Sequence, residues 1–204
     1  MQISDQTGYL WLWLYAQLFL LLCTQPLDSA GFGMQKIREW QISRKIRRKI
    51  WEKVPPGTIL RLGGMTDCFQ PVERQEQVTY QTIEQLNEYG IGYLIVTKSH
   101  LAGEERYRKL YDPKLAHIQI TITCFDDKKA LGYENASSPS KRLRALLKLQ
   151  EEGFDVTLRL SPLIEEYLDF DYLNRLPVNK VLVEFLRVNG WMKKMVSGSR
   201  LSEL

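Results

Sequence analysis

The sequence predicts a globular α/β domain built on a sheet of parallel strands. The prediction rests on short apolar runs that suit strands, on helical periodicity between those runs, and on a length of 204 residues with 44% hydrophobic and 25% charged side chains. A chain of this size and composition can bury a substantial core. Strands that alternate with helices are joined by crossovers, so the sheet is expected to be parallel, either open or closed into a barrel.

Five apolar runs are expected to form the strands. They are rich in Val, Ile, Thr and aromatic residues, which suit a pleated and half-buried backbone. In chain order they are 58–62 (TILRL), 92–97 (GYLIVT), 117–123 (HIQITIT), 155–160 (DVTLRL) and 180–185 (KVLVEF).

The segments between these runs are expected to be crossover helices. Residues 80–90 repeat apolar side chains at helical spacing and close on Gly90, a C-cap signal. Residues 140–153 show the same pattern, with Ser140 as the expected N-cap and Gly153 at the end. Segments 104–111 and 167–176 are less sharply marked but are long enough for helices.

A basic helix is expected before the first strand. Apolar residues recur every four positions at Ile42, Ile46 and Ile50, which places them on one stripe of a helix. Residues 36–53 carry eight Lys or Arg against two Glu, a local charge of +6 in a chain of net charge +4. A solvated helix face is favoured over a nucleic-acid surface, and the Pro and Gly of 54–58 end the helix.

The amino-terminal segment is strongly apolar. Residues 8–23 contain no charge, but they are shorter than the roughly 20 residues of a membrane span. Asp5 precedes them and no Lys or Arg does, which is the wrong flank for a secretory signal. An apolar segment buried in the domain or against a partner is therefore favoured over a signal or membrane anchor. The three cysteines are far apart in sequence, so a reducing, cytoplasmic setting is expected.

Polar residues follow every expected strand. The carboxyl ends of parallel strands form the ligand sites of α/β folds, so these residues are expected to converge on one site. They are Gly63, Gly64, Thr66 and Asp67 after the first strand, Thr97, Lys98 and Ser99 after the second, Thr121, Thr123 and Cys124 at the third, Arg159 and Ser161 at the fourth, and Glu184, Arg187 and Asn189 at the fifth.

An ordered set of motifs resembles a known family. The stretches GGMTDCFQPVE, LIVTKS, HIQITIT, YENASSPSKRLRAL and GFDVTLRLSPLI are similar in order and spacing to radical S-adenosylmethionine (radical SAM) enzymes of the branch related to spore photoproduct lyase. The resemblance covers about residues 55–194. It implies an α/β fold with a partial (β/α)6 TIM-like barrel, in which a 4Fe–4S cluster reductively cleaves S-adenosylmethionine to a radical that abstracts hydrogen from a substrate.

The resemblance also implies roles for single residues. Gly63 and Gly64 would allow a close approach to the amino-acid end of S-adenosylmethionine, with Thr66 and Asp67 beside it. Asp67 would accept from the ligand ammonium and Lys98 would pair with its carboxylate. Thr121 stands where relatives carry Ser or Thr near the ribose, and Arg159 and Glu184 are expected to line the barrel.

The chain departs from this family at the cluster loop. Relatives carry a Cys-x3-Cys-x2-Cys loop after the first barrel strand, because three thiolates hold three irons. The sequence has no such motif, and the matching positions are Thr7, Trp11 and Leu14. Cys23, Cys68 and Cys124 lack the spacing to replace it. No metal ligand is therefore assigned, the cluster is not expected to bind, and the first barrel strand is expected to be missing.

The sequence divides the chain into three regions and leaves two hypotheses about its function. Residues 1–33 do not match the family core, residues 34–194 form the truncated barrel domain, and residues 195–204 are a tail. Either the chain is a shortened or cluster-less copy of a radical enzyme, its amino terminus altered or arising from a reading-frame error, or it is a non-catalytic binding or partner protein anchored through its apolar start. S-adenosylmethionine is the expected ligand. The resemblance to spore photoproduct lyase and the basic segment 36–53 leave a nucleic-acid substrate as an open alternative. The sequence does not fix the substrate or the oligomeric state.

Overall fold

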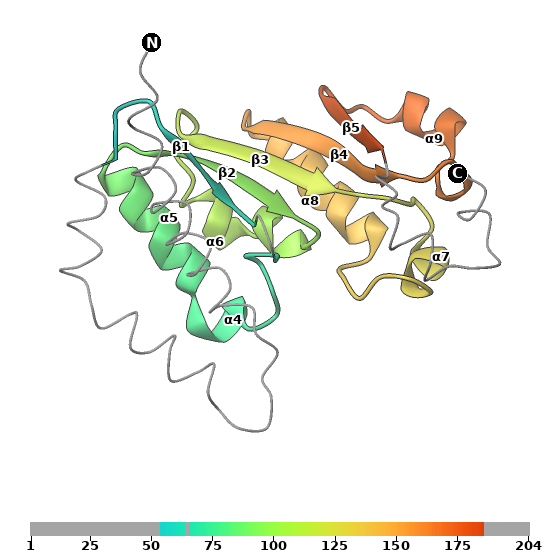
Figure 1. The fold of residues 1–204 in the computed structure, drawn as a ribbon, viewed down its shortest axis with the longest axis horizontal. Coiled ribbons are helices and arrows are strands. Elements are labelled where there is room, and N and C mark those ends of the chain that lie inside the picture. Colours follow the sequence, from blue (N-terminus) through green and yellow to red (C-terminus); the bar gives the residue numbers. More distant parts are fainter. Residues whose placement is uncertain (1–53, 64–65, 186–204) are drawn as a thin grey trace, which may run out of the picture.

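The computed structural model describes residues 54–63 and 66–185. They form an open sheet of five strands, β1 to β5, with helices between them (Figure 1). The strands are β1 (Ile59–Leu62), β2 (Gly92–Thr97), β3 (Ala116–Thr121), β4 (Asp155–Leu163) and β5 (Val181–Phe185). All neighbouring strands are parallel and lie in the order of the sequence, which confirms the predicted α/β class and parallel sheet.

The strand order places the main helices on one side of the sheet. Because every strand pairs with the next one in the chain and crossovers are right-handed, successive crossover helices fall on the same face. Figure 1 shows α5, α6 and α8 together on that side. The helical elements are α4 (Glu73–Glu76), α5 (Val78–Glu88), η1 (His100–Gly103), α6 (Glu105–Arg108), α7 (Asp127–Leu131), α8 (Pro139–Glu151), η2 (Glu165–Tyr167) and α9 (Phe170–Arg175).

The core lies between this helical layer and the sheet. Alternate strand residues such as Tyr93, Ile118 and Leu158 are buried, and the helices contribute Leu86 and Leu149. Each fully buried large apolar side chain stabilises the fold by about 1.5–3 kcal/mol. The opposite sheet face carries the other alternate residues, which are mostly polar on β3 and β4: His117, Gln119 and Thr121, then Asp155, Thr157, Arg159 and Ser161.

The sequence located the strands and the two long helices well. The five strands lie within one to three residues of their predicted bounds. Helices α5 and α8 cover the segments with clear periodicity, and the caps at Gly90 and Gly153 are confirmed by their positive φ angles of 63° and 83°.

The predicted N-cap of α8 was wrong. Ser138 occupies that position and Pro139 begins the helix, since Pro is favoured in the first turn. The Ser140 hydroxyl instead donates to Asp127 at 2.6 Å. The segments 104–111 and 167–176 contain only the short helices α6 and α9, and α4, η1, α7 and η2 were not predicted. The basic segment 36–53, the apolar start and the proposed loss of a first barrel strand lie outside the described residues.

A buried carboxylate fixes the start of α5. Glu73 is 3% exposed and accepts from the backbone amides of Thr79 and Tyr80, each at 2.9 Å, and from the Tyr107 hydroxyl at 2.5 Å. Burial raises the pKa of the Glu73 carboxyl, although all these donors favour its ionised form. The side chain therefore caps α5 from the preceding helix and connects it to α6.

We expect Glu73→Ala to lower the free energy of unfolding by about 3 kcal/mol, because buried donors lose their acceptor. Tyr107→Phe removes one of those donors and leaves the cap in place, so its cost is expected to be about 1 kcal/mol. Urea unfolding of both variants measures the difference. Equal losses in the two variants would contradict the capping role of Glu73.

Candidate functional site

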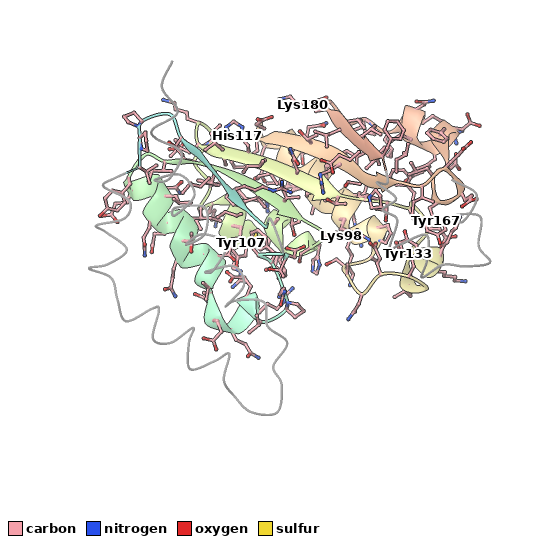
Figure 2. The ribbon with its side chains drawn as sticks, viewed as in Figure 1. Lys98, Tyr107, His117, Tyr133, Tyr167 and Lys180 are labelled. Carbon is pink, nitrogen blue, oxygen red and sulfur yellow. The ribbon has the colours of Figure 1, made fainter. Side chains whose placement is uncertain are left out.

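The candidate site is the edge of the sheet at which the strands end. Lys98 lies at this edge in Figure 2, whereas His117 and Lys180 lie toward the opposite end of the strands. The parallel register brings the ends of β1, β2, β3 and β4 to the same side. The predicted strand-end residues that the structure describes therefore share one rim.

Asp67 connects the ends of β1 and β2. Its Oδ1 accepts from the Thr97 hydroxyl at 2.7 Å and from the Phe69 amide at 2.9 Å, and its Oδ2 accepts from the Lys98 amide at 2.6 Å. The Thr97 hydroxyl in turn accepts from the Ser99 amide at 2.9 Å. The carboxylate expected to receive a ligand ammonium thus already holds the two loops together.

Gly63 is required by the backbone at the end of β1. Its φ is 88°, a region that L-residues rarely adopt, and a Cβ there would overlap the carbonyl oxygen of Val96. Close packing against β2 therefore explains this glycine without a ligand. Thr66 is half-buried in the same loop. Gly64 lies outside the described residues.

A buried arginine organises the middle of the rim. Arg142 on α8 is fully buried, and its guanidinium donates to the Thr121 carbonyl at 2.8 Å and forms an ion pair with Glu134. Glu134 also accepts from Lys98 Nζ at 2.8 Å. Burial raises the pKa of Glu134, but Lys98 and Arg142 outweigh it and lower that pKa overall, so the carboxyl is ionised at neutral pH.

The ends of β3, β4 and β5 are joined by a second polar chain. Arg159 lies 3.4 Å from the Thr121 hydroxyl and forms an ion pair with Glu184, which also accepts from the Ser161 hydroxyl at 2.7 Å. The Ser161 hydrogen bond and the charges of Arg159 and Arg61 lower the pKa of Glu184, so this carboxyl is ionised. Thr121 is 2% exposed, so Arg159 is the more accessible group here.

The two halves of the rim meet through residues that sequence reasoning did not select. Arg142 joins Thr121 to Glu134, and Glu134 joins Arg142 to Lys98. Arg142 and Glu134 both lie in the motif YENASSPSKRLRAL, in which the resemblance implies no role for a single residue. A charged residue inside the apolar stripe of 140–153 was the one available signal for Arg142.

The described part of the rim presents hydroxyls, carboxylates and cations. Among residues 54–63 and 66–185, no group of three His, Cys, Asp or Glu side chains is placed to hold a metal ion. Cys68 and Cys124, the cysteines in that range, are both buried.

Comparison with known proteins yields no family. No family model, curated protein or solved structure matches the chain. In addition, none of the helices in the described ranges is long and apolar enough to cross a membrane.

We expect Gly63→Ala to cost about 3–5 kcal/mol of unfolding free energy, the sum of an unfavourable φ and the overlap with β2. Gly57→Ala is the matched control, since Gly57 has a φ of 77° and no atom within 4 Å of the added Cβ. Its cost is expected to be about 1–2 kcal/mol. Thermal or urea unfolding distinguishes the two, and a Gly63 variant no less stable than the control would contradict the packing argument.

Proposed function

We propose that this chain is a cluster-less relative of the radical SAM enzymes that binds S-adenosylmethionine at the carboxyl-end rim of its sheet. The observation that carries the proposal is the convergence of Asp67, Lys98, Thr121, Arg159 and Glu184 on one rim of a parallel sheet. All five are residues that the sequence predicts for the site.

The strand order supports the barrel part of the proposal. A (β/α) barrel is built from parallel strands in sequential order with all helices outside, and the five strands here have that order and a one-sided helical layer. The polar residues of β3 and β4 then occupy what would be the inner face. We infer that the open sheet is part of a (β/α)6 barrel rather than of a doubly wound sheet.

The charges of the rim fit a zwitterionic ligand. Lys98 would pair with the ligand carboxylate, and its side chain is 36% exposed, so a ligand can reach it. Asp67 retains acceptor capacity on Oδ2 for an ammonium group. Glu134 already pairs with Lys98, so a ligand carboxylate must compete with it, and we expect weak affinity.

Radical chemistry is not part of the proposal for the chain as written. The sequence has no Cys-x3-Cys-x2-Cys motif, and the thiols of Cys68 and Cys124 are buried. The other hypothesis, a non-catalytic partner protein anchored through residues 1–33, predicts no binding of S-adenosylmethionine. Ligand titration therefore separates the two.

Lys98→Ala is expected to weaken S-adenosylmethionine binding by roughly 1.5–3 kcal/mol, because a charge-assisted contact to the carboxylate is lost. Isothermal titration calorimetry measures this difference. Lys109→Ala is the control, since Lys109 is exposed immediately after α6 and pairs with Glu105. Equal affinities for the two variants would remove Lys98 from the site, and no binding by the unmodified protein would overturn the proposed function.

Anaerobic reconstitution with iron and sulfide is expected to leave the unmodified protein without a 4Fe–4S cluster, because the aligned positions carry Thr7, Trp11 and Leu14 instead of thiolates. The triple variant Thr7→Cys, Trp11→Cys, Leu14→Cys tests that alignment by iron content and the charge-transfer absorption of the cluster. If the unmodified protein bound about four irons with matching sulfide, Cys23, Cys68 and Cys124 would have to be reconsidered as ligands.

A further inference from the structure

A cavity of about 290 Å³ lies beside the rim, between α4, η1 and the loop before α8. Cationic and hydrogen-bonding side chains converge on it from four segments of the chain. Its polar wall includes Gln70, Arg74, Lys98, His100, Asn135 and Ser137.

Positive charge exceeds negative charge around this cavity. Glu104 is shared between Arg74, at 2.6 Å, and Arg106, at 3.4 Å. Glu134 is shared in the same way between Lys98 and Arg142. Each of these two carboxylates therefore forms ion pairs with two cations. Asp67, which also lines the cavity, adds a third carboxylate, so the four cations exceed the three carboxylates by one.

Two further cations come from α8. Lys141 and Arg144 are exposed and form no ion pair with another described residue; they do not line the cavity, but their charges help to lower the pKa of His100. This excess of cations around one concave site is the arrangement that binds compact anions.

His100 stands at the centre of the cationic wall. Its Nδ1 lies 2.8 Å from the Ser137 hydroxyl, and its Nε2 lies 3.5 Å from the Arg74 guanidinium. Burial lowers the pKa of His100, Glu104 opposes this, and Arg74, Lys141 and Arg144 lower it further. The imidazole is therefore neutral at pH 7, and an anion beside it would favour its protonated form.

We propose that this cavity binds the phosphoryl group of a small phosphorylated compound, held by Arg74, Lys98 and His100. The convergence of the cations on one cavity favours a single compact anion over an extended polyanion, which would require a stripe of charge. The site is separate from the proposed S-adenosylmethionine site except for Asp67 and Lys98, which border both.

The test uses the full chain with inorganic phosphate and with sulfate, each titrated calorimetrically. Sulfate stays dianionic between about pH 8 and about pH 5.5, so a change in its affinity reports a proton taken up by the protein. We expect saturable binding of both anions, with sulfate affinity increasing as the pH is lowered. His100→Asn, which can keep a hydrogen bond to Ser137, is expected to abolish that increase.

Arg74→Gln is expected to weaken sulfate binding about tenfold, and Lys141→Gln, which removes a charge outside the cavity lining, is expected to weaken it less. Both side chains are exposed, so neither change should disturb the core. Lys109→Gln removes the same charge just after α6, outside the cavity, and is expected to leave the affinity unchanged.

Three results would overturn the proposal. In the first, neither phosphate nor sulfate shows saturable binding. In the second, Lys109→Gln weakens sulfate binding as much as Arg74→Gln does. In the third, the protein binds single-stranded DNA more tightly than phosphate, with an affinity that grows with the length of the DNA. Titration of Arg74→Gln with S-adenosylmethionine distinguishes the two proposed ligands. Unchanged affinity for S-adenosylmethionine together with lost sulfate binding supports a separate anion site.

Discussion

The buried charge of Arg142 is the constraint on which the rim of this sheet depends. A guanidinium without access to water must be met by acceptors, and here the Thr121 carbonyl and Glu134 provide them. Thr121 ends β3, Arg142 lies on α8, and Glu134 lies in the loop before α8, so one side chain fixes three segments. Since Glu134 also holds Lys98, the position of the most exposed cation at the rim depends on the same pair.

The strand order decides where such polar groups can lie. Consecutive parallel pairing sends the main helices to one face, so that face becomes the apolar core, and on β3 and β4 the other sheet face carries polar residues. Polar groups whose burial between helix and sheet would cost free energy lie instead on the open face and at the strand ends. The His117–Asp155 pair, at 2.6 Å, and the Arg159–Glu184 pair both lie there.

The parts predicted from the sequence are those determined by local patterns. Strands β1 to β5 and the ends of α5 and α8 follow from β-branched runs and from glycines at positive φ. The role of Gly63 needed the neighbouring strand, because the atom that excludes a side chain belongs to Val96, 33 positions later. The capping of α5 by Glu73 and the pairing of Glu134 with Lys98 are likewise tertiary contacts. Short helices such as α7 lack the length to show a period.

Lys98 connects the two proposed ligand sites in one electrostatic argument. Its ammonium group is held by Glu134 between the rim and the cationic cavity, and it borders both. A carboxylate bound at the rim would draw positive charge toward the sheet, whereas a phosphoryl group in the cavity would draw it toward α4. One flexible ammonium cannot satisfy both anions fully, so each ligand weakens the binding of the other. By thermodynamic linkage, each ligand changes the binding free energy of the other by the same amount. The size of that change therefore measures how strongly both ligands depend on Lys98.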